Sequence, residues 1–395
     1  MPVPVLLAAL GALVVSLDSS VNIGLPAMAA AFGIGPGAIR WIIVCYVLTY
    51  AVTAFGAGLL ADRLGPAQVF TAGLMVSGLA FAAYAAAPSF GLVLALRVVQ
   101  GIGGGLVYGA APALVTQSLP RERHGRGLGV MSVGLGAGLT AGPVIGGLLV
   151  GTFGWLSVFL FRAPLALALG ALATTTLRTS RPGGAVPRMV APGEILRAPV
   201  LTTALLAFLA NYAQFAVWLL VPFYLVSVRA ITPTLGGMLF TLTPLGTAAA
   251  APVAGWAADR VRPHWPSTAG LLVEVAGLLI ISRFTADSDL LSVMAGLALV
   301  GLGVGIFQVS NLAEMMAAFP RSQQGAAGGL AFLSRTLGSA VGVQVTAALF
   351  DARLAWGFIA AFRWAFLGAA AAAGLAVLLA AIPAFRARRG PAAAL

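Results

Sequence analysis

Residues Gly125–Leu149 read GRGLGVMSVGLGAGLTAGPVIGGLL, and no charged residue follows Arg126 in this stretch. Its glycines recur once per helical turn on one face, at Gly134, Gly138, Gly142 and Gly146. In a membrane such a stripe lets another helix approach closely, because lipid supplies no hydrophobic drive for helices to associate. The Gly142-Pro143 step removes a backbone donor, so we expect a bend there. The stretch indicates a membrane helix built for close packing.

The same pattern returns two hundred residues later. Gly325, Gly329, Gly338 and Gly342 match Gly125, Gly129, Gly138 and Gly142. Gly101, Gly103 and Gly105 likewise recur as Gly301, Gly303 and Gly305, and Asp62-Arg63 recurs as Asp259-Arg260. A single stripe would indicate only a generic packing face, whereas its repetition implies two equivalent halves. Two halves of the same topology are typical of transporters with a substrate site at mid-membrane between them.

Composition defines the broad class. The chain is 60% hydrophobic and 8% charged over 395 residues, against about 25% charged in soluble domains. It therefore reads as an all-α, polytopic membrane protein. The lone cysteine, Cys45, excludes an intrachain disulfide and a cysteine metal cluster. No Gly-x-x-x-x-Gly-Lys phosphate loop is present, and the two histidines fall in loops, so we expect neither an enzyme, nor a cofactor, nor ATP as the energy source.

Twelve apolar runs are long enough to cross a bilayer, at about 20 residues each. They cover residues 5–31, 39–61, 67–87, 89–117, 126–150, 156–177, 198–228, 234–258, 265–284, 290–318, 325–350 and 357–384. Residues 178–197 are rich in Pro, Gly and Arg, which is typical of a linker. We therefore predict an N-terminal six-helix half at 1–177, a cytoplasmic linker at 178–197 and a C-terminal half at 198–395.

The arginines give the orientation. All 22 basic residues are arginine, and most fall in loops on the side of the N-terminus. The opposite loops hold four, at Arg40, Arg229, Arg283 and Arg353. The positive-inside rule then places both termini and the linker in the cytoplasm. The net charge of +12 is thus a topology signal, with anionic lipid rather than nucleic acid as its neighbour.

Four ordered motifs resemble those of the major facilitator superfamily, and within it the drug:proton antiporters. GLLADRLG (Gly58–Gly65) is similar to the loop 2–3 signature, and LRVVQGIGGG (Leu96–Gly105) to the helix 4 signature. GLTAGPVIGGLL (Gly138–Leu149) resembles the antiporter signature of helix 5, through Gly138, Gly142, Pro143, Gly146 and Gly147. We expect Gly138, Gly142 and Gly146 to permit close approach of this helix to a partner from the other half. LDSSVNIGLP (Leu17–Pro26) resembles helix 1 of a branch that usually has fourteen spans, and SRTLGSAVG (Ser334–Gly342) suits its helix 11. The chain departs from that branch by its twelve spans, by Pro66 and Ala67 after the loop signature, and by Arg162 where Asn is common.

The resemblance implies a gate on the cytoplasmic side. Its residues would be Gly58, Asp62, Arg63 and Gly65, with Asp259 and Arg260 in the second copy. A carboxylate at a helix end can favour one arrangement of the halves through charge pairing and a helix dipole. The alternative is a solvated Asp-Arg turn.

Ionisable groups within the spans are costly in hydrocarbon and normally face a cavity or a partner. Asp18, Arg97 and Glu314 are the candidates for proton coupling. By resemblance, helices 1, 4, 7 and 10 line the substrate cavity, through Asn22, Gln100, Tyr108, Asn211, Gln214, Trp218, Gln308 and Asn311. Interhelical hydrogen bonding is the alternative for the amides. Glu274, Arg162 and Arg363 fall on outer helices, where we expect structural pairing or snorkelling arginines, and Arg335 is expected to pair with an inner carboxylate.

These features predict an inner-membrane, monomeric antiporter that exports amphiphilic or cationic drug-like compounds by alternating access in exchange for protons. Asp18 is the expected proton-responsive group, because burial favours its neutral form and Arg97 its charged form. A fixed Asp18–Arg97 ion pair is the alternative. The alternative functions are an uptake permease or symporter for a small metabolite, and a non-transporting membrane sensor.

Overall fold

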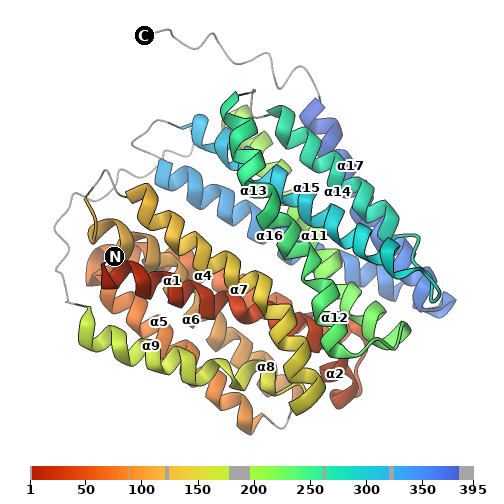
Figure 1. Cartoon of the computed structure of the whole chain (residues 1–395), viewed down its shortest axis with the longest axis horizontal. Coiled ribbons are helices and arrows are strands. Elements are labelled where there is room, and N and C mark those ends of the chain that lie inside the picture. Colours follow the sequence, from red (N-terminus) through yellow and green to blue (C-terminus); the bar gives the residue numbers. More distant parts are fainter. Residues whose placement is uncertain are drawn as a thin grey trace. The chain divides into compact units, whose positions relative to one another are not determined.

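The computed structural model describes residues 2–87, 89–120, 124–177, 196–260, 264–319 and 324–381 (Figure 1). These ranges are almost entirely helical and contain no strand. Nine of their helices are long and apolar enough to cross a membrane. The other three expected spans correspond to α12 (Pro233–Phe240) with α13 (Leu242–Arg260), to α14 (His264–Ile281) and to α16 (Gln324–Asp351). The predicted all-α class with two six-helix halves is confirmed.

The elements follow the expected spans closely. The first span corresponds to α1 (Val3–Ser16), η1 (Leu17–Ser19) and α2 (Ser20–Phe32). The second, third and fourth correspond to α4 (Trp41–Leu64), to α5 (Pro66–Ala83) with η2 (Tyr84–Ala86), and to α6 (Phe90–Gln117). The fifth corresponds to α7 (His124–Phe153), and the sixth to α8 (Ser157–Leu160) with α9 (Arg162–Thr176). The short α3 (Pro36–Ile39) precedes α4. The seventh span corresponds to α11 (Ala198–Phe223) with the π-helical η4 (Tyr224–Val228), and the eighth to α12 (Pro233–Phe240) with α13 (Leu242–Arg260). The ninth, tenth and eleventh correspond to α14 (His264–Ile281), α15 (Leu290–Ala317) and α16 (Gln324–Asp351). The last corresponds to α17 (Phe358–Ala381), which follows η6 (Leu354–Trp356).

The first and the fifth span differ in how regular their helices are. The first span is interrupted by a 3-10 turn at Leu17–Ser19, and this turn carries Asp18. Ser16 stands at the end of α1, where its hydroxyl donates to the Ala12 carbonyl at 2.6 Å, a back-bond that is known to bend helices. In contrast, α7 continues through Pro143 as one helix.

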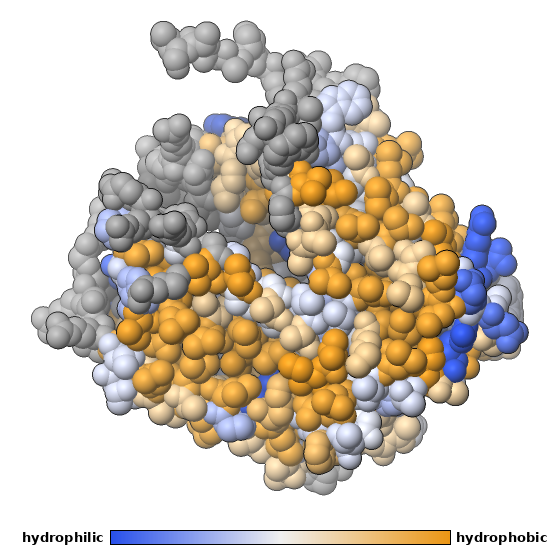
Figure 2. Space-filling model, in the orientation of Figure 1, coloured by the Kyte–Doolittle hydropathy of each residue, from blue (hydrophilic) through white to orange (hydrophobic). Residues whose placement is uncertain are grey.

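The described chain divides into two compact units. The first contains residues 1–186 and 218–244, and the second contains 187–217 and 245–395. The boundary therefore falls within α11, between Val217 and Trp218, and α12 belongs to the first unit. Large apolar side chains are exposed on several helices, such as Leu79 on α5, Leu172 on α9 and Leu378 on α17. Figure 2 shows how widely such hydrophobic residues cover one face, as contact with lipid requires.

The glycine stripe of α7 packs against the first span. A Cβ at Gly134 or Gly138 would collide with the carbonyls of Ala9 and Leu13 on α1, and one at Gly142 or Gly146 would collide with Ser19 or Ser20. We had expected Gly138, Gly142 and Gly146 to meet a helix of the other half, and this is wrong. Their partner lies in the same half, so a larger residue there should disturb folding rather than a moving interface.

The repeat has a structural counterpart in the second unit. On α16, a Cβ at Gly338 or Gly342 would collide with the backbone of Phe208 or Tyr212 on α11. In each half, therefore, glycines on the fifth helix allow that helix to contact the backbone of the first helix. A second pair of seams joins α5 to α6 at Gly73 and Gly103, and α14 to α15 at Gly270 and Gly303.

Gly138→Val should lower the stability of the protein, because the added side chain meets the α1 backbone. Overpacking of this kind costs about 1–3 kcal/mol. Gly136→Val is the matched control, since nothing lies within 4 Å of a Cβ at that position. Thermal unfolding of the detergent-solubilised variants should show a lower midpoint for Gly138→Val only; equal midpoints would contradict the packing role of the stripe.

Candidate functional site

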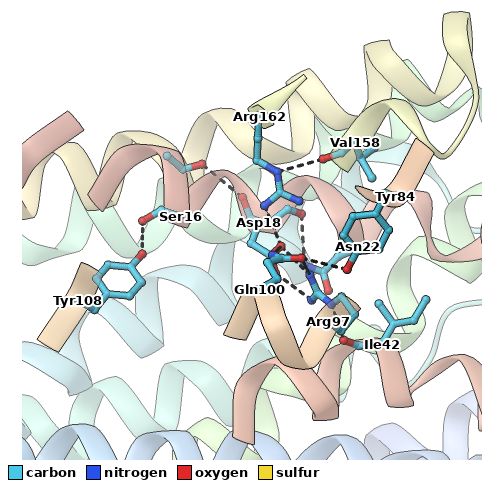
Figure 3. Close-up of polar contacts among 12 residues, drawn as sticks. Ser16, Asp18, Asn22, Ile42, Tyr84, Arg97, Gln100, Tyr108, Val158 and Arg162 are labelled. Carbon is cyan, nitrogen blue, oxygen red and sulfur yellow. Dashed lines mark hydrogen bonds and ion pairs between the residues drawn. The ribbon is translucent and has the colours of Figure 1, made fainter. Parts of the chain in front are cut away.

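The candidate site is centred on Asp18 in the 3-10 turn of the first span. The turn brings the carboxylate next to α6 and α9, which supply Arg97 and Arg162 (Figure 3). The Asp18 side chain retains 13% of its exposure, whereas the whole residues Arg97 and Arg162 retain 1% and 0%. The first span, α6 and α9 of the first unit thus converge on one partly buried carboxylate.

Arg97 binds Asp18 in a bidentate arrangement. Its Nη1 donates to Oδ1 at 2.7 Å and its Nη2 to Oδ2 at 2.9 Å. The remaining Nε donates to the Ile42 carbonyl at 2.7 Å. This fork geometry is the strongest form of a charge-assisted hydrogen bond and fixes the plane of both groups. The pairing that was an alternative for Asp18 is therefore present in this conformation.

Arg162 adds a second guanidinium to the same carboxylate. Its Nη1 donates to Asp18 Oδ1 at 2.8 Å, and its Nε donates to the Val158 carbonyl at 3.1 Å. Its Nη2 is buried and has no hydrogen-bond partner among the described residues. Arg162 was expected to pair structurally or to snorkel; it pairs, and complete burial excludes snorkelling.

Amide and aromatic groups complete the site. Gln100 donates through Nε2 to Asp18 Oδ1 at 2.7 Å, and its Oε1 accepts from Arg97 at 3.0 Å and from Tyr84 at 3.2 Å. The Arg97 guanidinium lies 4.4 Å from the centre of the Tyr46 ring, and that of Arg162 lies 4.4 Å from the centre of the Phe81 ring. Such cation–π contacts help to hold a cation away from water.

The cluster carries a net charge of +1, because two guanidiniums share one carboxylate. Protonation of Asp18 in this arrangement would leave two buried cations without an anion, which is strongly unfavourable. Asp18 can accept a proton readily only after at least one arginine has moved away. The geometry therefore suits a group whose protonation depends on the relative position of α6, α9 and the first span.

The other candidates of the first unit are distributed around this centre. Gln100 belongs to the ion cluster through three hydrogen bonds, and its contact with a solute stays a prediction. Asn22 donates to the Ser19 carbonyl at 3.2 Å, one turn from Asp18. Tyr108 lies further along α6, with its hydroxyl 2.6 Å from Ser16 Oγ. Trp218 also lies in this unit and packs edge-on against Phe240.

The candidates of the second unit make contacts of their own. Asn211 donates to the Ala207 carbonyl at 2.9 Å within α11, and Asn311 on α15 donates across to the Thr203 carbonyl at 3.1 Å. Gln308 accepts from Arg335 at 2.7 Å. The expected pairing of Arg335 with an inner carboxylate stays a prediction. Gln214 and Glu314 are buried. Substrate contact and proton coupling by these residues stay predictions.

The expected cytoplasmic gate is only partly described. The side chains of Asp62, Asp259 and Arg260 lie outside the described residues. Arg63 is exposed at the end of α4, and Gly58 has open space around it. Gly65 has φ +95°, a conformation that favours glycine, and it links α4 directly to α5. The gating role of the loop stays a prediction.

The far end of α7 makes a separate contact with α12. A Cβ at Gly147 would collide with Pro233, and one at Gly237 would collide with the Pro143 carbonyl. Thr234 donates to the Gly147 carbonyl at 3.3 Å, and Thr241 donates to the Thr140 carbonyl at 3.3 Å. The antiporter-like motif thus has two faces: one packs on the first span, and the other packs on α12.

The sequence missed part of the site. Arg162 was assigned to an outer helix, although a buried charge in a span is itself a signal of a partner. Tyr84, Tyr46 and Phe81 had no signal, because aromatic residues in apolar spans are common. Within the described ranges, no group of three or more His, Cys, Asp or Glu could hold a metal.

Comparison with known proteins gives consistent matches. The family model of the Major Facilitator Superfamily matches residues 7–232 and 203–394. The chain is 29% identical to the tetracenomycin C resistance and export protein of Streptomyces glaucescens, covering 92% of this chain and 78% of that protein. It is 25% identical to the riboflavin transporter RibZ of Clostridioides difficile, covering 88% of each chain.

Solved structures show the same fold at low sequence identity. A bacterial homologue of the human lysosomal transporter Spinster, in an inward-facing and unoccupied conformation, superposes with a TM-score of 0.83 at 15% identity, covering 98% of both chains. The nucleoside transporter NupG superposes with a TM-score of 0.79 at 10% identity, covering 98% of this chain and all of that one.

Charge counting predicts the effect of substitutions at the site. Asp18→Asn should destabilise the protein by about 3–5 kcal/mol, because two buried guanidiniums lose their anion. Arg162→Met should cost less, since Arg97 and Asp18 still pair. The double variant restores the net charge of +1 and should be more stable than Asp18→Asn alone. Chemical or thermal unfolding in detergent measures all three; a double variant no more stable than Asp18→Asn would contradict the shared-carboxylate arrangement.

Proposed function

Because the chain belongs to the Major Facilitator Superfamily, we propose that this membrane transporter exports amphiphilic, drug-like compounds in exchange for protons. The proposal rests mainly on one observation: the antiporter-like motif of α7 packs against both the first span and α12. Relatives that include an antibiotic resistance and export protein support the direction of transport. The excess of arginine in the N-terminal-side loops supports an inner-membrane location with both termini in the cytoplasm. We further propose that it acts as a monomer.

Asp18 is the proposed coupling group. In the observed arrangement two guanidiniums hold it as a carboxylate. A movement that withdraws α6 or α9 from the first span would remove this support and make the neutral acid favourable. Proton binding and helix movement would then be linked, which is the requirement for alternating access driven by a proton gradient.

The charge of the site bears on the substrate class. The Asp18 carboxylate is already neutralised by two cations, so it offers no free negative charge to a cationic substrate in this conformation. Amphiphilic compounds of low net charge are therefore favoured over strongly cationic ones. Tyr108, Trp218 and the amides predicted to line the cavity suit such solutes through apolar and hydrogen-bonding contacts.

Uptake of a small metabolite is the second candidate. It is favoured by the relative named as a riboflavin transporter, which covers 88% of this chain, against 92% for the tetracenomycin C resistance and export protein. The same fold and the same ion cluster could serve either direction, since the direction depends on which state binds substrate and proton. A transport assay in cells decides between the two functions.

The export function can be tested by expressing the protein in an efflux-deficient bacterial host. A panel of antibiotics and lipophilic dyes should show reduced susceptibility and reduced accumulation, and a protonophore should abolish both effects. Increased accumulation of a compound, riboflavin included, would favour uptake instead. No change for any compound in either direction would contradict the proposal.

The coupling role of Asp18 needs a variant that keeps the charge balance. Asp18→Asn combined with Arg162→Met has the same net charge as the parent but no carboxyl group. It should lose gradient-driven export to the level of the empty vector, while the purified variant still binds substrate. Arg162→Met alone is the matched control and should retain part of the export. Full export by the double variant would place coupling elsewhere, with Glu314 as the next candidate.

The contact between α7 and α12 is proposed as a closing contact of the transport cycle. Gly237→Ala places a methyl group against the Pro143 carbonyl, so it should weaken the contact and lower the export rate. Gly236→Ala is the matched control, because the atoms nearest to a Cβ there belong to Ile23, Val226 and Leu225 and lie at ordinary distances of 3.4–3.9 Å. Initial export rates should separate the two variants. Equal rates would mean that this contact does not limit transport.

A further inference from the structure

Glu274 is a second buried acid, in the other unit and with the opposite surroundings. It lies in α14, is 0% exposed, and neither of its carboxylate oxygens has a hydrogen-bond partner among the described residues. Asp18 has four donated hydrogen bonds from two arginines and an amide, whereas Glu274 has none that the structure describes. An acid buried in a membrane helix without a partner is a candidate functional group.

The packing around Glu274 is tight. A Cβ at Gly303 on α15 would collide with the backbone nitrogen of Glu274, and one at Gly270 would collide with Phe307. The backbones of α14 and α15 therefore touch at this residue and one turn before it, and α17 packs against α14 as well. The seam excludes water from the acid in the observed conformation.

No described charged group lies beside Glu274 on the helices that pack against it. On α15 the titratable residue is Glu314, eleven residues beyond Gly303 and thus about 16 Å further along the helix. On α17 the titratable residue is Arg363, which is exposed. Its neighbour Phe362 stacks against Phe284, which follows the end of α14. On α11 it is Tyr212, on the face that packs against Gly342 of α16.

An ionised carboxylate in such a place would be buried without a counter-ion or a donor, which costs many kcal/mol. The group avoids this cost by holding a proton on one oxygen. Asp18 and Glu274 would therefore be in opposite states in the same conformation: Asp18 is a paired carboxylate, and Glu274 is a neutral acid.

The duplication shows that the fold does not require an acid here. In the first unit, Ser77 of α5 occupies the equivalent place, since a Cβ at Gly103 would collide with Ser77 as one at Gly303 would with Glu274. A small hydroxyl fills the seam in one half and a carboxyl in the other. Packing alone therefore does not explain the acid.

We propose that Glu274 is a second proton-binding site of the transporter, loaded in the observed conformation and emptied when α14 and α15 separate enough to admit water. The proton binds one carboxylate oxygen as O–H and leaves to water, and no other bond changes. This inference rests on the proposed antiport, because proton exchange between Glu274 and water contributes to transport only in a proton-coupled cycle.

Infrared spectroscopy of the full-length protein in lipid vesicles tests the site with protons alone, so no transported compound is required. The carbonyl band of a neutral carboxylic acid should appear at neutral pH in the parent and be missing in Glu274→Gln. The band should shift in heavy water and decline reversibly at alkaline pH. Asp18→Asn is the control and should leave the band in place, and Glu274→Asp, which keeps the carboxyl, should restore it.

Each outcome decides a separate point. A Glu274→Gln spectrum identical to that of the parent would mean that Glu274 is ionised, and this would overturn the proposal. A band that neither exchanges in heavy water nor responds to pH would identify a sealed structural acid, which overturns it equally. A wild-type protein that fails to transport any compound would defeat the antiport proposal while the infrared result stayed valid.

Discussion

Close approach of helix backbones is the constraint on which this structure depends. Lipid does not push apolar helices together, so packing surfaces must be made by letting backbones touch. The stripe Gly134, Gly138 and Gly142 does this for α7 against the first span, and Gly338 with Gly342 does it for α16 against α11. The α7 seam holds the first span, including the 3-10 turn that presents Asp18 to Arg97 and Arg162.

The sequence predicted the class, the spans and the duplication because each depends on one-dimensional patterns. Apolar runs of bilayer length identify spans, and repeated glycines at equal spacing identify equivalent halves. The same patterns do not reveal which helix a face meets. The α7 stripe was therefore identified correctly as a packing face but assigned to the wrong partner, because periodicity defines a face and not its neighbour.

The candidate site was predictable to the same degree. Asp18 and Arg97 stand out as charges within apolar spans, and their contact was among the expected arrangements. Arg162 is 144 residues away from Asp18 in the chain, so only the folded arrangement of the first, fourth and sixth spans brings it to the same carboxylate. The break at Leu17–Ser19 was missed because a 3-10 turn and an α-helix differ by one residue in hydrogen-bond spacing, which side-chain hydrophobicity does not record.

Three of the four bonds to Asp18 end on a single atom. Arg97, Gln100 and Arg162 all donate to Oδ1, at 2.7, 2.7 and 2.8 Å. Rotation of the carboxylate, or a small shift of the turn that carries it, would therefore break all three together instead of one after another. Movement of this oxygen would therefore loosen the first span from α6 and from α9 at the same time. A single oxygen atom thus links three parts of the first unit.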